Sequence, residues 1–447
     1  MIRLTSYEQA FATLPEGICE AEVNAERRNV TTLFVSGGEI RGSEAFVQTK
    51  YYVRASGERT GMIYTEDPDE DAADVLRRAM ANAAFTTSPE PEPMNRGEAP
   101  QHLDDTPVPS VEELLDAACR LEKLLAGADI LTLSVTCTER ELRTLNSHGY
   151  DANSRTVHIQ LYTMVSLPRT GMQSSVIETS VTARTIREID VAAFAAKALR
   201  LASAYDGGGL APVTIPGGTY DAVLSGQVMR NILMTAWRAF SAEAMQRGGS
   251  CFHARGEQAG SRAFSLLNGP VHPVSGECWP IDSEGTAMKE TLVVDQGVIR
   301  EPLYTLASAK ADGTVSNGCT GRVPCMTGNV PISLTTVPGL FYVKPGEQTE
   351  ASLLNEMKNG LYLTYSLDLF HSVNIASGEF SVPCGGVYYE NGRPVGSVSQ
   401  ITVAGRLPEL FSAITAVADD LDFDDFYFSN YAVGSPAVLA RGLTFAS

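Results

Sequence analysis

The sequence lacks long apolar segments. No apolar run in its 447 residues approaches the roughly 20 residues that a membrane-spanning helix needs. The first stretch, Met1 to Glu20, has neither the basic segment nor the apolar core of a secretory leader. We therefore expect a cytoplasmic protein that makes no contact with a membrane.

Several reactive motifs are also missing. The 8 cysteines include no C-x-x-C pair, and so few in so long a chain do not make a disulfide framework. We interpret them as reduced thiols, most of them buried. The sequence contains no G-x-x-x-x-G-K loop and no G-x-S-x-G turn. Neither a nucleotide-binding loop nor an α/β-hydrolase nucleophile is therefore expected.

Positive charge is scarce in this chain. It carries 34 lysines and arginines against 53 aspartates and glutamates, which gives a formal net charge of -19. The electrostatic field of such a net charge repels a phosphate backbone unless a local basic patch opposes it. Direct binding of nucleic acid is therefore not expected.

The N-terminal half carries the same order of predicted elements twice. Residues 29–64 are rich in Val, Thr, Phe and Tyr and are interrupted by glycine turns, which predicts a meander of antiparallel strands. A helix follows, and Asp69 or Asp71 is placed to cap it. Residues 129–182 repeat the strand-rich pattern and lead into a second helix over 189–201. We predict an internal duplication of one α+β unit.

A proline-rich linker separates the two predicted units. Residues 86–109 contain prolines and acids without a periodic apolar pattern, a composition that does not order itself unaided. At the end of this linker, Ser110 precedes Glu113 by three residues, which is the spacing of a capping box. The apolar residues that follow predict a helix that stops at Gly127.

A second domain is expected after the glycine-rich run of residues 206–218. This run indicates a boundary, so we divide the chain into an N-terminal domain, 1–205, and a C-terminal domain, 215–447. In the second domain a strand at 220–224 leads into one long helix, Ser225 to Gln246, and short β segments fill the rest. The predicted fold class is α+β, with a duplicated N-terminal meander and helix unit and a larger β-rich C-terminal domain with a long helix.

Several short motifs, in order along the chain, give the sequence a family resemblance. Each motif is weak alone, but together they span nearly the whole chain. With them the sequence resembles the TldD/PmbA family, once named modulators of DNA gyrase and understood as subunits of a zinc peptidase. The motifs are Arg54-Ala-Ser-Gly57-Glu-Arg-Thr-Gly61, Gly218-Thr-Tyr-Asp-Ala-Val-Leu224, Ile281-Asp282-Ser-Glu284-Gly285-Thr286, Ser377-Gly378-Glu-Phe380-Ser381 and Gly434-Ser-Pro436.

The zinc-binding residues of that family are missing. Its catalytic member bears His-Glu-x-x-x-His on the helix after the Gly-Thr strand, where histidines hold zinc and the glutamate serves as base. By the resemblance these positions fall on residues 230–235, which carry Arg230, Asn231 and Thr235 instead. The 6 histidines include no pair at i, i+4, and residues 426–447 lack the cysteine that completes the family's metal site. This pattern is that of the PmbA-like subunit, also called TldE.

Two acidic groups are further candidates. Asp282 and Glu284 form a pair of carboxylates of the kind used in acid/base catalysis, but the resemblance favours a loop at the rim of the substrate cleft. The aspartates of residues 419–425 are interleaved with Leu421 and Phe423. That spacing indicates the edge of a strand or helix with a solvated face rather than a calcium site.

The resemblance implies that this chain is the non-metal subunit of a cytoplasmic metallopeptidase complex that cleaves unfolded or precursor peptides. It implies no cofactor in this chain, and zinc only in a TldD-like partner subunit. The expected substrate or partner cleft contains Arg230, Asn231, Thr235, Asp282 and Glu284, with Arg230 free to contact a carboxylate of the peptide or of the partner. Alone, the chain is expected to be inactive and able to form a homodimer. Two alternatives stay open: a stand-alone hydrolase with a non-zinc site, and a homodimeric peptide-binding scaffold.

Overall fold

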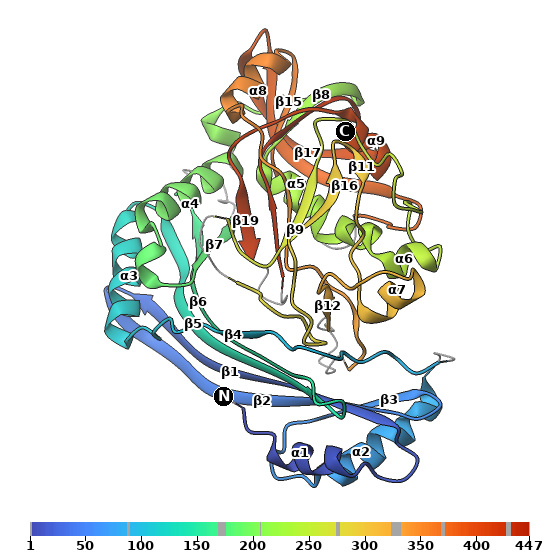
Figure 1. The fold of residues 1–447 in the computed structure, drawn as a ribbon. Coiled ribbons are helices and arrows are strands. Elements are labelled where there is room, and N and C mark those ends of the chain that lie inside the picture. Colours follow the sequence, from blue (N-terminus) through green and yellow to red (C-terminus); the bar gives the residue numbers. More distant parts are fainter. Residues whose placement is uncertain are drawn as a thin grey trace.

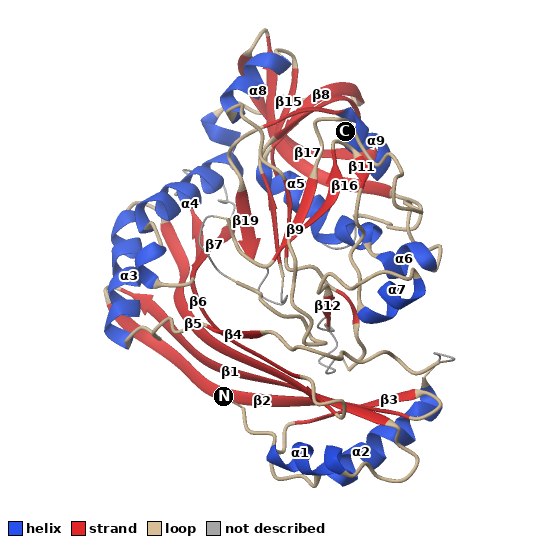
Figure 2. Cartoon of the chain, in the orientation of Figure 1, coloured by secondary structure: helices blue, strands red, loops and turns tan. Residues whose placement is uncertain are grey.

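The protein has two parts that meet along one face of a long curved sheet (Figure 1). The computed structural model describes residues 2–86, 90–168, 176–205, 207–273, 278–322, 332–367, 372–425 and 431–446. The N-terminal part contains this sheet. The C-terminal part lies above the sheet in this view and is built mostly of strands (Figure 2).

The N-terminal part is one 7-stranded sheet with flanking helices. Its elements are α1 (Thr5–Ala12), β1 (Glu20–Ser36), β2 (Glu39–Ser56), β3 (Thr60–Thr65), α2 (Ala72–Ala81), β4 (Gln101–Leu103), α3 (Val111–Leu124), β5 (Asp129–Asn146), β6 (Asp151–Ser166), β7 (Ile177–Ala183) and α4 (Val191–Tyr205). The strand order is β3-β2-β1-β5-β6, and β4 and β7 pair with different segments of β6. Continuous antiparallel pairing of β1 with β5 joins the two hairpins.

The order helix, three strands, helix occurs twice in this part. The first unit contains α1, β1 to β3 and α2, and the second contains α3, β5 to β7 and α4. The expected caps are present, since the Asp71 side chain accepts a hydrogen bond from the backbone of Asp74, and Ser110 and Glu113 form the capping box. The α+β class is therefore confirmed.

The two faces of this sheet differ in chemistry. On β1, Ala21, Val23 and Ala25 pack with α1 and α2, while Leu33 and Val35 pack with α3 and α4 in a second core. These residues are at odd positions and so share one face of the strand. The even positions near the start of β1 carry buried polar and charged side chains instead. The helices thus leave a polar face for the C-terminal part.

The C-terminal part contains two 6-stranded sheets. Its elements are β8 (Gly218–Leu224), α5 (Gly226–Ala236), α6 (Ala242–Gln246), β9 (Leu266–Gly269), β10 (Thr291–Asp295), β11 (Val298–Ile299), α7 (Leu306–Ala311), β12 (Thr320–Gly321), β13 (Thr335–Thr336), β14 (Leu340–Val343), α8 (Glu350–Met357), β15 (Gly360–Ser366), β16 (Glu379–Glu390), β17 (Arg393–Arg406), α9 (Leu407–Ala413), β18 (Ile414–Val417), β19 (Asp422–Asp425), β20 (Ala432–Ser435) and β21 (Val438–Ala446). One sheet has the order β17-β16-β15-β8-β21-β18 and curls until β17 also pairs with β21. The other has the order β11-β10-β9-β14-β20-β19, and α5 contacts strands of both sheets.

The prediction of one helix from Ser225 to Gln246 is wrong in its extent. Helix α5 ends at Ala236, a 3-10 turn follows, and Ser241 is extended (φ -73°, ψ 127°) before α6 begins. The Ser241 side chain accepts a hydrogen bond from the first turn of α6, so it caps a new helix. Apart from Gln227, every residue of α5 is buried. Arg230 and Asn231, which the resemblance expects at the substrate or partner cleft, are therefore buried within the packed helix.

The predicted linker is bound along the sheet. Strand β4 lies within it and pairs in parallel with β6, and Met94 is buried. Residues 87–89 of this linker lie outside the described residues. A proline-rich segment without a core of its own is thus ordered by pairing with a sheet edge.

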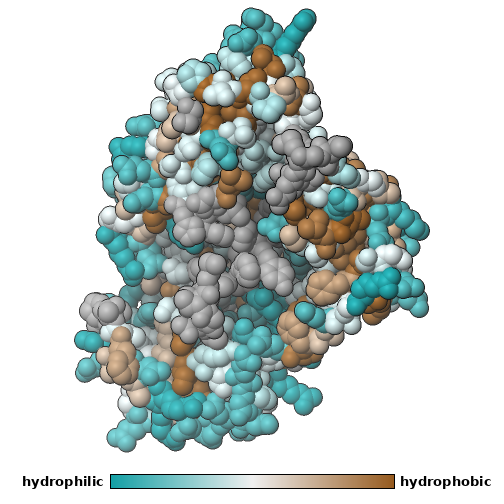
Figure 3. All heavy atoms as spheres, turned by 180° about the vertical axis from the view of Figure 1, so that it is seen from behind, coloured by the Kyte–Doolittle hydropathy of each residue, from teal (hydrophilic) through white to brown (hydrophobic). Residues whose placement is uncertain are grey.

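The surface separates into polar and apolar areas. From behind, the lower end of the molecule, where α1 and α2 lie, is mostly hydrophilic, and hydrophobic residues gather at mid-height on the side of α3 and α4 (Figure 3). Val111 and Leu124 of α3 are among the exposed large hydrophobic residues. Within the ranges given above, no helix is long and apolar enough to cross a membrane.

Trp237, directly after α5, tests how much stability this core provides. It is 1% exposed and packs edge-on against Tyr431 with ring centroids 5.5 Å apart. We expect Trp237→Ala to lower the free energy of unfolding by about 3–5 kcal/mol, because a large buried ring is replaced by a cavity. Chemical denaturation measures this. Phe85→Ala is the control, since Phe85 is 85% exposed; an equal loss in both variants would contradict the assignment of Trp237 to the core.

Candidate functional site

Helix α5 carries the positions at which the resemblance expects metal ligands. The Ser225 side chain accepts a hydrogen bond from the backbone of Val228 and caps the helix. Arg230 is 1% exposed, and its Nη1 lies 2.6 Å from Oδ2 of Asp422. The Nζ of Lys197 on α4 lies 2.7 Å from Oδ1 of the same carboxylate. Asp422 therefore joins α4, α5 and β19 in one ion-paired cluster.

The charges of this cluster keep Asp422 ionised. Burial alone would raise the pKa of Asp422, but the positive charges of Lys197 and Arg230 outweigh that effect and hold the pKa at about 2. The Asp422 side chain is 38% exposed, so water screens part of the attraction. Arg230 is enclosed, and the carboxylate of Asp422 supplies negative charge beside it.

The residues at the metal positions do not fit zinc. The Nδ2 of Asn231 donates a hydrogen bond to Oγ of Ser366 at 2.8 Å, Thr235 is buried, and the Arg230 guanidinium is permanently charged. Zinc takes thiolate, imidazole or carboxylate ligands. Among the described residues, no group of 3 or more His, Cys, Asp or Glu side chains could hold a metal ion. Where the resemblance expects a zinc ion, the guanidinium of Arg230 carries the positive charge.

A cavity of about 760 Å³ lies beside the cluster. Its lining includes Asp422, the N-terminal residues of α5 and α8, and Arg200 from α4. Tyr362 and Tyr389 give it an aromatic side next to Glu350. Burial raises the pKa of Glu350, and a hydrogen bond from Tyr362 opposes that rise. The lining thus combines apolar, aromatic, basic and acidic groups, and it offers contacts to both apolar and charged groups of a ligand.

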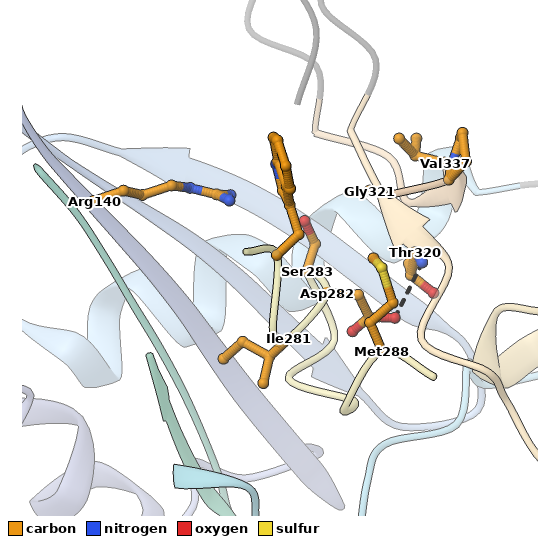
Figure 4. Close-up of a pocket in the computed structure, with 10 residues that line it drawn as sticks. Arg140, Ile281, Asp282, Ser283, Met288, Thr320, Gly321 and Val337 are labelled. Carbon is orange, nitrogen blue, oxygen red and sulfur yellow. Dashed lines mark hydrogen bonds between the residues drawn. The ribbon is translucent and has the colours of Figure 1, made fainter. Parts of the chain in front are cut away.

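Asp282 and Glu284 lie elsewhere, in a loop buried between the two parts. The Oδ1 of Asp282 accepts hydrogen bonds from the backbone N–H groups of Glu284 and Thr286 at 2.9 Å, and its Oδ2 accepts one from Thr320 at 3.0 Å. The loop lines a cavity of about 30 Å³ (Figure 4), which has room for about one water molecule. Burial, with the charge of Glu284, raises the pKa of Asp282, and the three backbone hydrogen bonds oppose that rise. The three backbone donors show that Asp282 shapes this loop.

Arg54 fastens Glu284 to the N-terminal sheet. Arg54 is 1% exposed, and its Nη2 lies 2.6 Å from Oε1 of Glu22 on β1. Its Nη1 lies 3.5 Å from Oε1 of Glu284 and 3.4 Å from Oε2 of Glu92 in the linker. Thr320 donates a hydrogen bond to the other oxygen of Glu284 at 2.6 Å. Burial raises the pKa of Glu22 even though Arg54 opposes the rise.

The five residues expected to share one cleft therefore fall into two groups. Arg230, Asn231 and Thr235 lie within α5, and Asp282 and Glu284 lie in the loop between the two parts. All five are buried, and the expectation that Arg230 is free is corrected by its ion pair with a carboxylate of β19. A contact of these residues with peptide or partner stays a prediction.

Sequence reasoning missed the partners of these residues because they are distant in the chain. Asp422 is 225 residues from Lys197 and 192 residues from Arg230. The acidic run that contains Asp422 was interpreted as a solvated edge. One signal was available, since Lys197 lies among the apolar residues of its predicted helix. A lysine in such a place needs a buried or nearby acid.

Two models of one protein family match this chain, one in each of its two parts. Residues 217–447 match the model described as the PmbA/TldA metallopeptidase C-terminal domain, and residues 21–83 match PmbA/TldA metallopeptidase domain 1. A metalloprotease PmbA homolog of Haemophilus influenzae is 31% identical over 156 residues, which are 35% of this chain and 30% of that protein. Metalloprotease PmbA of Escherichia coli O157:H7 is 30% identical over 143 residues, 32% of this chain and 28% of that protein. These alignments thus cover less than a third of either relative.

Solved structures match the whole fold. A protein described as a modulator of DNA gyrase from Thermotoga maritima has a TM-score of 0.78 and 22% identity, and the match covers 99% of each chain. TldE from Thermococcus kodakarensis has a TM-score of 0.79 and 18% identity, and that match covers 99% of this chain and 100% of the other. At these identities the likeness shows the shared architecture.

Removal of Arg230 tests whether the ion-paired cluster is structural. We expect Arg230→Ala to lower the free energy of unfolding by about 3 kcal/mol, because it leaves a cavity where this buried side chain packs and removes one of the two cations that pair with Asp422. The control is Arg247→Ala, since Arg247 is 77% exposed in its pair with Glu243 and such pairs contribute about 1 kcal/mol at most. If denaturation shows equal stability for both variants, the cluster is not part of the core.

The low pKa of Asp422 predicts a pH dependence. Its folded pKa of about 2 lies below the ordinary aspartate value of 3.8, so Asp422 contributes stability above the unfolded pKa and loses that contribution as the pH falls toward 2. Asp422→Asn removes this titration. We expect the wild type to be more stable than the variant at pH 6, and the difference to shrink between pH 4 and pH 2.5. A difference that stays constant over this interval would contradict the lowered pKa.

Proposed function

This chain belongs to the PmbA/TldD family, and from that premise we propose that it is the non-metal subunit of a two-subunit metallopeptidase that cleaves unfolded or precursor peptides. The observation that carries the proposal is the buried ion pair of Arg230 on α5. The resemblance implies that the equivalent position in a zinc-bearing member of the family holds a ligand. Here a guanidinium is neutralised by Asp422 instead, and a second cation cannot be added without repulsion.

In this proposal the zinc ion and the attacking water belong to a TldD-like partner subunit. This chain supplies part of the wall against which the peptide is held. The cavity beside α5 offers Tyr362 and Tyr389 for apolar and aromatic side chains, and Arg200 and Glu350 for charged ones. Contacts of this kind position a peptide and exclude water from the reacting bond.

The names of the relatives support the proposal. The relatives from Haemophilus influenzae and Escherichia coli are named metalloproteases, and the structural neighbour from Thermococcus kodakarensis is named TldE. The sequence alignments cover less than a third of the two named metalloproteases. A peptidase activity of this chain is therefore part of the proposal.

A reconstitution assay tests this function. The purified chain, a zinc-bearing TldD-like protein and their equimolar mixture are each incubated with an unfolded peptide, and the products are measured by mass spectrometry. We expect cleavage only by the mixture, and its loss when a chelator removes zinc, because this chain has no group that activates water at the α5 positions. Elemental analysis should find zinc in the partner and less than about a tenth of an equivalent in this chain.

Other results would favour the alternatives. Chelator-resistant cleavage by this chain alone would indicate a stand-alone hydrolase with a non-zinc site. Peptide binding without cleavage by any mixture, together with a dimer in light scattering, would indicate a homodimeric scaffold. One equivalent of tightly held zinc in this chain alone would contradict the proposal directly.

A further inference from the structure

Strand β2 has a long open edge. It pairs with β1 along its whole length, but β3 covers its other side only from Tyr51 to Ser56. Over the described residues, no strand pairs with the outer side of β2 between Glu39 and Lys50. The residues at positions 43–47 are all exposed. An edge of this length leaves backbone N–H and C=O groups without a ladder partner.

This edge is held in place from both ends. At the β1–β2 turn, the N–H groups of Gly37 and Gly38 donate hydrogen bonds to the carboxylate of Glu122 on α3, at 2.6 and 2.8 Å. At the other end β3 begins to pair at Tyr51. Behind the edge, β1 is fixed by its continuous pairing with β5. A strand held in this way is ordered before it meets a ligand, which lowers the entropy cost of binding.

The second unit of the duplication shows what occupies the related edge. In β6, which corresponds to β2, residues 159–165 pair with β7 and residues 153–155 pair in parallel with β4. Strand β4 comes from the proline-rich linker and has no core of its own. The same sheet therefore already accepts an extended, otherwise irregular segment at the early half of its outer strand. In the first unit the corresponding half of β2 has no such segment within the described ranges.

The side chains along the open edge suit an unfolded peptide. Phe46 is 49% exposed and Val47 is 56% exposed, and since they are neighbours in a strand they point to opposite faces. The charged residues of this segment balance, in contrast to the net charge of -19 of the chain. They are Glu39, Arg41, Glu44 and Lys50. A peptide laid on this edge therefore finds an apolar anchor on each face and little net charge.

We propose that the outer edge of β2, residues 39–50, binds an extended peptide as an added strand, as β4 lies on β6. The backbone of the peptide pairs with the edge, so binding does not depend on one sequence, and Phe46 and Val47 favour apolar residues near the centre. That the ligand is an unfolded peptide rests on the proposed function, whereas the open edge itself does not.

Fluorescence anisotropy of the full-length chain tests this site without the partner. The probe is a labelled, unstructured peptide of about twelve uncharged residues rich in Val and Thr, since such residues suit added strands. We expect the double variant Phe46→Lys with Val47→Lys to raise its Kd at least tenfold, because lysine on an edge opposes strand addition. The control is Val315→Lys, since Val315 is 69% exposed in the C-terminal part, and it should leave the Kd unchanged. Circular dichroism establishes that the variants are folded.

A second probe separates backbone pairing from apolar contact. The same peptide, N-methylated at three successive central residues, keeps its side chains but loses N–H groups, and its Kd should also rise at least tenfold. The proposal is overturned if the wild type does not bind the unmodified peptide, if the N-methylated peptide binds equally well, or if the double variant binds like the wild type. It is also overturned if the double variant only converts a dimer to a monomer in light scattering, since the occupant is then a second copy of this chain.

The reconstitution assay distinguishes failure of this site from failure of the proposed function. If the probe binds at the edge of β2 but no mixture cleaves peptide, the binding site is supported and the peptidase role is contradicted. If neither the wild type nor the double variant binds the probe, yet both support cleavage equally, the peptidase role is supported and the binding site on β2 is contradicted.

Discussion

One buried guanidinium holds together three segments that are distant in the chain. Arg54 contacts carboxylates of Glu22 on β1, Glu92 in the linker and Glu284 in the C-terminal part, and it is 1% exposed. A charge so enclosed is stable only when its partners are in place, so the sheet, the linker and the C-terminal loop must assemble together. This contact also explains two motifs of the family resemblance. The motif that begins at Arg54 and the motif that contains Glu284 meet at this ion pair, and Asp282 shapes the loop that brings Glu284 to it.

A second buried guanidinium organises the site at α5. Arg230 and Lys197 come from different parts of the molecule and share the carboxylate of Asp422. Asp422 also lines the cavity of about 760 Å³, so the ion-paired cluster and the cavity wall are one structure. At residues 230–235, where the resemblance expects metal ligands, this chain has an ion pair and close packing.

The sequence predicted the elements of the N-terminal part well because their signals are local. The capping box of Ser110 and the glycine turn between β1 and β2 act over a few residues, and both are present. The extent of α5 was predicted less well, since apolar periodicity continues through the 3-10 turn and only the extended Ser241 interrupts the helix. The ion pairs could not be predicted from spacing, because Asp422 meets Lys197 across 225 residues. For the candidate site, the five residues could be named from the sequence. Their separation into two buried groups could not be predicted.

The duplication explains why one sheet has both a closed edge and an open one. In the second unit, α4 contributes Lys197 to the cluster at Asp422, and β4 and β7 cover the outer strand. In the first unit, Tyr52 and Arg54 contact the C-terminal part, through Arg322 and Glu284, and both belong to the half of β2 that β3 covers. Among the residues that the structure describes, the other half of β2 takes no part in that contact network. Both units thus contact the C-terminal part. The segment of β2 that makes no such contact is an ordered, nearly neutral strand edge.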